Sequence, residues 1–325
     1  MPHLVVAPST DLSGDLVVEA FKALGVGVWR LCQDHFFDCP EWECRELGDG
    51  DPLLIPSSSM TGVELRPSQV ETIFYRPLRV PVSSPNVDAG EFIEREWRHF
   101  VMGALLQSAA PWVNSPYANV RASHKTWQLH LARKLGLAVP DTLVTTSAKH
   151  LRKFVARKGA CVVKPVSYGW FQDSHSNERV MYTRRVVLDD LPQRSDQLLL
   201  GSPTLIQEEV SRAFDVRMTV LGRWMQAFAI SWDQESDVDW RSAADVSYTP
   251  IDVAREIREK VYSLHQSLGI HFGTVDFVVR KGDGAWVFLE TNPAGQWGWL
   301  DQHVGKGDTP SVGIARALVS LHRSA

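Results

Sequence analysis

Two apolar segments near the end of the chain constrain its fold most. Residues 272–280 and 285–291 alternate in the manner of β-strands, and the short loop between them contains two glycines, which suits a tight hairpin. Pairing about the centre of that loop places Asp276 opposite Glu290. The period of two along a strand then adds Asn292 to the face that carries Glu290. The sequence therefore predicts two carboxylates and one amide on one face of an antiparallel hairpin.

These three side chains offer the hard oxygen ligands that Mg²⁺ prefers when it is bound to phosphates. The alternative is a hairpin with solvent-facing acids, because a slip of one residue would turn Asp276 to the other face. Two basic residues favour the phosphate interpretation. Lys164 ends an apolar strand and precedes a segment, 167–177, that we expect to be irregular. Arg217 alternates with apolar neighbours and therefore faces away from them. Each of these two residues, taken alone, also fits a solvated surface position.

The first part of the chain, residues 1–118, has the pattern of a small α/β lobe. Residues 4–7 and 26–31 read as strands, and a stretch of helical periodicity between them ends at a glycine. This order of strand, helix and strand predicts a parallel sheet. Two further apolar runs, 53–55 and 72–75, are expected to add strands to that sheet.

The remaining chain divides into a mixed part and a part made mostly of strands. Residues 119–200 contain helical patterns, one of which Ser147 is placed to cap, and an apolar strand at 160–164. Residues 201–325 contain a run of strands with an antiparallel hairpin, followed by the hairpin of Asp276. In the first part of the chain, a longer amphipathic helix is expected over residues 91–108.

Composition excludes several classes of partner. The net charge of −4 and the isoelectric point near 6.3 give no basic surface for nucleic acid. The most apolar helical stretch is interrupted by Gln107 and followed by Pro111, so it is too short for a membrane span. The first residues lack the pattern of a signal peptide, and the four cysteines lack the spacing of a zinc site. We therefore expect a cytoplasmic protein with no nucleic-acid or membrane partner, and a homodimer as the default assembly.

Eleven residues, spread between positions 125 and 292, occur in the order found in the nucleotide sites of ATP-grasp ligases, which this chain resembles. They are Lys125, Lys164, Gln207, Glu208, Glu209, Val210, Asp215, Arg217, Asp276, Glu290 and Asn292. The resemblance implies that ATP and Mg²⁺ are the cofactors. It also implies that the two lysines contact the nucleotide phosphates, that residues 207–210 receive adenine and ribose, and that Asp215 belongs to the same cofactor site.

The resemblance further implies the metal ligands, the catalytic residues and the fold. The metal ligands would be Asp276, Glu290 and Asn292, and the catalytic residues would be Arg217, Lys164 and Asn292. The fold would be an α/β ATP-grasp fold of three lobes. These lobes are an N-terminal α/β lobe (1–118), a central lobe (119–200) and a C-terminal catalytic lobe with an antiparallel sheet (201–325).

A narrower resemblance, to the graspetide synthetases that make microviridin-type cyclic peptides, extends over nearly the whole chain. The segments that carry it are 75–77, 96–98, 112–116, 135–142 and 292–297. One departure lies in the loop after Lys164, which contains one glycine, Gly169, where many ATP-grasp enzymes have a glycine-rich lid. Trp297 and Trp299 have two interpretations, as packed core or as support for a substrate peptide.

This resemblance implies a ligase that activates Asp or Glu side chains of a ribosomal precursor peptide as acyl phosphates and closes ester or amide rings. The partner would be a precursor with a leader and a core, and the leader would bind the N-terminal or central lobe. One alternative is an ATP-grasp ligase that joins free amino acids or short peptides, since the nucleotide site is the same. Another is a nucleotide-binding regulatory protein without turnover, which would not need the metal residues.

Overall fold

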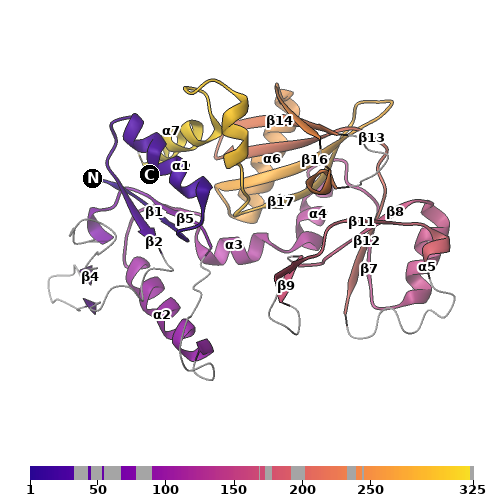
Figure 1. The fold of residues 1–325 in the computed structure, drawn as a ribbon, viewed down its shortest axis with the longest axis horizontal. Coiled ribbons are helices and arrows are strands. Elements are labelled where there is room, and N and C mark those ends of the chain that lie inside the picture. Colours follow the sequence, from indigo (N-terminus) through magenta and orange to yellow (C-terminus); the bar gives the residue numbers. More distant parts are fainter. Residues whose placement is uncertain are drawn as a thin grey trace.

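Three β-sheets form the framework of the molecule. The computed structural model describes residues 1–32, 43–44, 53–54, 67–77, 90–167, 169–172, 178–191, 202–232, 239–243 and 245–322. Figure 1 shows the sheet of the N-terminal part on the left, the large sheet formed by residues 212–292 in the centre, and a smaller sheet on the right. Helices α3 (Pro116–Ala122) and α4 (Lys125–Lys134) connect the left and right parts beneath the central sheet (Figure 1).

The N-terminal sheet is parallel, as the order of strand, helix and strand predicted. Its strands, in spatial order, are β2 (Val28–Cys32), β1 (His3–Ala7), β5 (Ile73–Tyr75) and β6 (Trp112–Val113). Helices α1 (Leu12–Ala23) and α2 (Gly90–Leu105) belong to this part. Val5 packs with residues of α1, whereas Leu4 and Val6 pack with residues of α2. Because both faces are covered, residues 4–7 of β1 and 73–75 of β5 are continuous apolar runs.

One strand prediction in this part is wrong. Strand β4 (Leu53–Leu54) pairs antiparallel with β3 (Glu43–Cys44) in a separate two-stranded sheet instead of joining the parallel sheet. A nearby partner is favoured because a short loop costs less conformational entropy to close. The run at 72–75 joins the parallel sheet as expected, as β5.

The smaller sheet is antiparallel and is covered by one amphipathic helix. Its strands, in spatial order, are β11 (Arg184–Val186), β8 (Cys161–Lys164), β12 (Thr204–Glu208) and β7 (Thr142–Thr145). Helix α5 (Ala148–Lys158) begins at the predicted cap, where the Ser147 hydroxyl accepts a bond from the His150 amide. It ends at Gly159, whose φ of 78° suits a glycine.

A small hairpin, β9 (Trp170–Gln172) with β10 (Glu178–Val180), follows β8. The expectation of an irregular segment over 167–177 is therefore wrong for residues 170–172, which pair with the chain that returns immediately after them. A short turn of 3-10 helix, η4 (Leu188–Asp190), follows β11.

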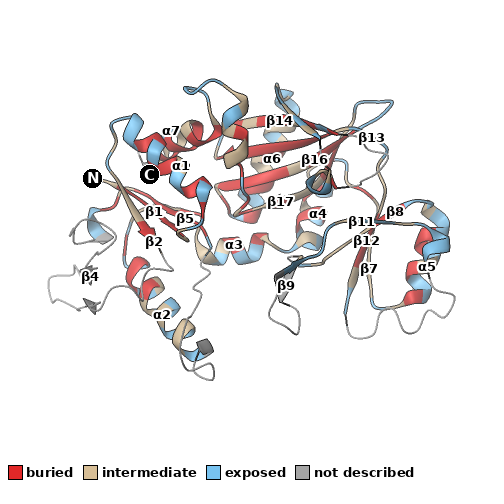
Figure 2. Ribbon diagram, in the orientation of Figure 1, coloured by how far each residue is buried: buried red, intermediate tan, exposed pale blue. Residues whose placement is uncertain are grey.

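The central sheet contains five antiparallel strands. They are β15 (Val246–Ile251), β14 (Trp224–Trp232), β13 (Arg212–Leu221), β16 (Phe272–Arg280) and β17 (Trp286–Asn292), in spatial order. Helix α6 (Arg255–Leu268) packs against one face together with α4 and α3, and helix α7 (Pro310–His322) contacts α1, β13 and β14. Figure 2 shows that the central strands and the inward faces of these helices are buried.

The division of the chain into lobes at residues 118 and 200 stays a prediction. Strand β12 follows residue 200 but completes the smaller sheet, and α4 follows residue 118 but packs on the central sheet. None of the helices that the structure describes is both long and apolar enough to cross a membrane.

Candidate active site

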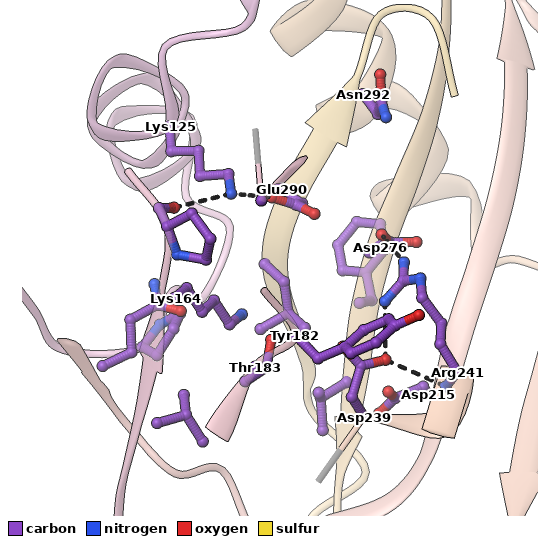
Figure 3. Close-up of a pocket in the computed structure, with 18 of the residues that line it drawn as sticks. Lys125, Lys164, Tyr182, Thr183, Asp215, Asp239, Arg241, Asp276, Glu290 and Asn292 are labelled. Carbon is purple, nitrogen blue, oxygen red and sulfur yellow. Dashed lines mark hydrogen bonds and ion pairs between the residues drawn. The ribbon is translucent and has the colours of Figure 1, made fainter. Parts of the chain in front are cut away.

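A cleft of about 350 Å³ lies between the smaller sheet and the central sheet. Figure 3 shows side chains from both sheets and from α4 pointing into it. The cleft is lined by every residue predicted for the nucleotide or the metal, namely Lys125, Lys164, Gln207, Glu208, Glu209, Val210, Asp215, Asp276, Glu290 and Asn292. Arg217, predicted as catalytic, does not line it. The fold therefore brings the ten residues predicted for the nucleotide and the metal together in one cleft.

The acidic wall of the cleft comes from the β16–β17 hairpin. Asp276 pairs with Glu290 and Thr274 pairs with Asn292, so the predicted register is confirmed at the site. Nearer the loop the strands pair one residue out of that register, with Phe277 opposite Phe288, and a β-bulge restores it. The bulge inserts one residue into β17 and thereby brings Glu290 opposite Asp276.

The basic wall comes from α4 and β8. Lys125 begins α4, and its Nζ lies 3.0 Å from the carbonyl oxygen of Pro165 and 3.4 Å from Oε2 of Glu290. Lys164 is the last residue of β8 and extends into the cleft (Figure 3). The two lysines thus approach the cleft from the side opposite the carboxylates, and each offers an ammonium group that can bind a phosphate.

Burial and the charges across the cleft together set the pKa values of Lys164 and Glu290. Burial lowers the pKa of Lys164, against the opposing influence of Glu290. Burial acts to raise the pKa of Glu290, but Lys125 and Lys164 outweigh it, so the pKa lies below its ordinary value. Glu290 is therefore ionised at neutral pH, as a metal ligand must be.

Arg217 lies behind the acidic wall. Its side chain is 5% exposed, and its Nη1 donates to both oxygens of Asp276 at 2.8 and 2.9 Å. Its Nη2 donates to the carbonyl of Gln296 at 2.8 Å. The prediction that Arg217 faces away from Val216 and Met218 is confirmed, since those two residues pack in the apolar core on the other face. What Arg217 holds in this structure is the Asp276 carboxylate.

The predicted adenine segment is held to the smaller sheet by its side chains. Gln207 donates from Nε2 to the hydroxyl of Thr142 at 3.0 Å. Glu208 pairs with Lys158 at 3.0 Å, and Glu209 pairs with the guanidinium of Arg185 through two contacts of 2.6 and 2.8 Å. These pairings fix the chain between β12 and β13 along one rim of the cleft.

Three further charged residues, Asp215, Asp239 and Arg241, line the cleft next to the acidic wall. Burial raises the pKa of Asp215 to about 7, with Arg212 opposing it and Asp276 adding to it. Arg241 is 40% exposed, with Nη1 at 3.0 Å from Asp239 and Nη2 at 3.7 Å from Asp276. Asp215 and Arg241 line the same cleft, and a carboxyl with a pKa near neutrality can accept a proton there.

Several solved structures resemble this one along the whole chain. The macrocyclase MdnC from Microcystis aeruginosa MRC, bound with precursor peptide MdnA, is 25% identical, with a TM-score of 0.81 over 98% of this chain and 100% of that one. The ATP-grasp ligase PsnB, complexed with a phosphomimetic variant of its minimal precursor, Mg and ADP, is 23% identical, with a TM-score of 0.75 over 99% of both chains. The RiPP-associated ATP-grasp ligase from Chryseobacterium gregarium, in complex with ADP and a leader and core peptide, is 20% identical, with a TM-score of 0.82 over 100% of this chain and 97% of that one.

The chain has the ATP-grasp fold. The resemblance to peptide-modifying ATP-grasp ligases that the sequence indicated is confirmed by these structures. No protein-family model and no curated protein matches the sequence.

Two residues near the cleft could not be predicted from the sequence. Arg241 follows a stretch without periodicity, so no pattern assigned it to a face. Gln128 lies one helical turn after Lys125, is 1% exposed, and donates from Nε2 to the carbonyl of Thr291 at 2.8 Å while its Oε1 accepts from the Thr291 amide at 2.9 Å. A glutamine on the apolar side of α4, beside Leu129 and Ala132, was the available signal.

The two tryptophans of the loop after β17 differ in role. Trp297 is fully buried and donates from Nε1 to the hydroxyl of Ser311 at 3.0 Å, so the core interpretation holds for it. Trp299 is half-buried, with its ring 5.7 Å from the guanidinium carbon of Arg217 and 5.9 Å from the ring of Trp240. An aromatic surface therefore adjoins Arg241 and Asp276.

The oxygen donors on the hairpin fit a magnesium ion that shares its coordination with phosphates. Asp276 and Glu290 supply carboxylates, and Asn292 supplies an amide oxygen, which also accepts from the Ala294 amide at 3.0 Å. Across the described residues no cluster of three His, Cys, Asp or Glu side chains could hold a metal by itself. A site that needs phosphate oxygens to complete its shell is what Mg²⁺ usually occupies in nucleotide enzymes.

Proposed function

We propose that this protein is an ATP-dependent, ADP-forming ligase that activates Asp or Glu side chains of a ribosomal precursor peptide as acyl phosphates and closes ester or amide rings within that peptide. The observation that carries the proposal is the opposition of two walls, lysines on one side and an Asp–Glu–Asn set on the other, in a fold shared with peptide-bound ligases. The solved structures with ADP support ATP as the phosphoryl donor.

In this proposal the two walls divide the work of phosphoryl transfer. Lys125 and Lys164 bind phosphate oxygens, and residues 207–210 receive the adenine and ribose. Asp276, Glu290 and Asn292 hold Mg²⁺, which when bound offsets the charge that develops on the phosphates. Arg217 holds the Asp276 carboxylate in one orientation.

Arg241 and Asp215, next to the acidic wall, supply the groups for the substrate. Arg241 attracts the peptide carboxylate, one oxygen of which forms a bond to the γ-phosphorus of ATP as ADP departs. A hydroxyl or amine of the same peptide then bonds to the acyl carbon, and inorganic phosphate leaves. Asp215, with a pKa of about 7, accepts the proton that the attacking group loses.

The test is mass spectrometry of a candidate precursor, encoded by a short reading frame rich in Thr, Ser, Asp and Glu beside the gene. With ATP and Mg²⁺ the peptide should lose one water for each ring, and the lost mass should map to Asp or Glu linked to Thr, Ser or Lys. Deleting the leader should abolish modification of an intact core, because a separate docking surface raises the effective concentration of the core at the cleft.

Two other results would each replace the proposal. Efficient ligation of free amino acids, with no water lost from the peptide, would favour the small-molecule ligase. Nucleotide binding without ADP release from any substrate would favour the regulatory protein. The homodimer and the cytoplasmic location stay predictions from the sequence.

A further inference from the structure

The loop that follows strand β17, residues 293–298, is held by three residues of the N-terminal part, Asp11, Ser13 and Arg76. Arg76, at the end of β5, is 3% exposed and donates from Nη1 to the carbonyl of Gly295 at 3.1 Å. Its Nη2 lies 3.4 Å from Asp11, with which it also forms a closer contact through Nε. The guanidinium carbon stands 4.9 Å from the ring centre of Trp297. A buried ion pair thus fixes one carbonyl of the loop.

Ser13, in the first turn of α1, binds the next three residues of the same loop. Its Oγ donates to Oε1 of Gln296 at 2.5 Å, and it accepts from the amides of Trp297 at 3.4 Å and Gly298 at 3.2 Å. Ser13 is 1% exposed, so water does not replace these bonds. The hydroxyl therefore fixes the path of the loop immediately after Gly295.

The loop has no room to shift toward the sheet beneath it. A Cβ on Gly295 would fall 1.7 Å from Oγ1 of Thr274 on β16, so this position requires a glycine. The loop is pressed between Thr274 on one side and the N-terminal residues on the other. Its carbonyls consequently have defined positions.

One of those carbonyls controls the acidic wall. The carbonyl of Gln296 accepts from Arg217 Nη2 at 2.8 Å, and Nη1 of the same guanidinium holds both oxygens of Asp276. A planar guanidinium that is fixed at one edge by a carbonyl presents its other edge in one orientation. A shift of the loop carbonyl would therefore turn the Asp276 carboxylate.

We propose that Ser13 and the Arg76–Asp11 pair are positioning residues for the metal carboxylate Asp276, which they reach through the loop carbonyls of Gly295 and Gln296 and the side chain of Arg217. The inference rests on the proposed function, since it takes Asp276 as a ligand of Mg²⁺. Groups outside the coordination shell commonly set metal affinity through the orientation of the ligands.

Ser13→Ala tests the proposal without leaving a buried charge, and Ser311→Ala is its matched control. Ser311 is 2% exposed and binds the indole of Trp297, so it contacts the same loop but not the carbonyls that lead to Arg217. The readout is the ADP-dependent binding of Mn²⁺, followed by electron paramagnetic resonance without turnover. Ser13→Ala removes three hydrogen bonds of the loop, and we expect the dissociation constant of Mn²⁺ to rise about fivefold, which corresponds to the net effect of one neutral hydrogen bond.

In steady-state assays Ser13→Ala should need more Mg²⁺ for half-maximal ADP release, while kcat at saturating Mg²⁺ stays near that of the wild type. Ser311→Ala should lower the melting temperature and leave the Mn²⁺ affinity unchanged. Wild-type Mn²⁺ affinity in Ser13→Ala, or an equal loss in both variants, would overturn the proposal. If Glu290→Gln binds Mn²⁺ as the wild type does, the metal site itself is misplaced, which is a failure of the proposed function and is thereby distinguished from a failure of positioning.

Discussion

Replacement of Gln128 by leucine should damage the acidic wall without touching any of its carboxylates. Gln128 is 1% exposed, and its amide bonds to Thr291 N, Thr291 O and, at 2.5 Å, the carbonyl of Ala122. Thr291 lies between Glu290 and Asn292 on β17. Leucine has similar volume but no polar atoms, so three buried backbone groups lose their partners.

The magnitude follows from these three groups. Each unsatisfied buried group costs about 1 to 3 kcal/mol, and partial relaxation reduces the sum, so we expect a loss of about 3 to 5 kcal/mol in the free energy of unfolding. Because the freed strand carries two proposed ligands, the affinity for Mg²⁺ in the presence of ADP should fall roughly tenfold or more.

Urea denaturation and metal titration separate the two effects, with Leu129→Ala as the control. Leu129 follows Gln128 on α4, and its side chain enters the apolar core. Truncation there should cost about 2 to 5 kcal/mol, a loss similar to that of Gln128→Leu, and leave the metal affinity unchanged. If Gln128→Leu loses stability but binds Mg²⁺ as the wild type does, Gln128 only packs the helix against the strand and does not position the metal ligands on β17.

Three further predictions concern the cleft itself. Glu290→Gln should fold normally but lose ADP release with peptide substrate, because the metal loses a charged ligand; full activity would show that the metal site is wrongly assigned. Arg217→Lys should lower turnover more than ATP binding, since lysine lacks the planar group whose two nitrogens bind Asp276 and the Gln296 carbonyl; turnover equal to that of the wild type would contradict this. The pKa of Asp215 rises from 3.8 to about 7 on folding, so the folded protein holds a proton that the unfolded chain releases. In metal-free protein the free energy of unfolding, measured by urea titration, should therefore fall as the pH rises from 3.8 to about 7. Asp215→Asn should remove this fall. If the fall is the same in Asp215→Asn, the raised pKa does not belong to Asp215.

The sequence predicted the acidic wall because strand periodicity and a short loop define which residues face each other. The same periodicity assigned Arg217 to the polar face. It could not reveal the bulge in β17, since an inserted residue leaves no mark in the apolar pattern; the predicted pairing of Asp276 with Glu290 depends on that bulge.

Contacts between distant segments were beyond the reach of local patterns. The prediction for 53–55 was wrong for residues 53–54, and residue 55 lies outside the described residues; an apolar run indicates a strand but not its partner. Arg241 and Gln128 could not be assigned to the cleft, since their positions depend on how a loop and a helix dock onto the central sheet. The bonds of Ser13 to residues 296–298 join positions more than 280 residues apart in the chain.

Strand β17 lies at the edge of the central sheet, and this has a consequence for how other chains can approach it. An edge strand with free amides and carbonyls can pair with an added strand from a peptide. It can also pair with the edge strand of a second copy, and that pairing leads to aggregation. Here the outward amide of Phe288 is bonded to the carbonyl of Ala138 at 2.8 Å, and the outward groups of Thr291 are bonded to Gln128. A peptide that enters the cleft must therefore be recognised through its side chains and not by strand addition at these positions, and the strand that carries two of the acidic-wall residues is protected there from edge-to-edge association.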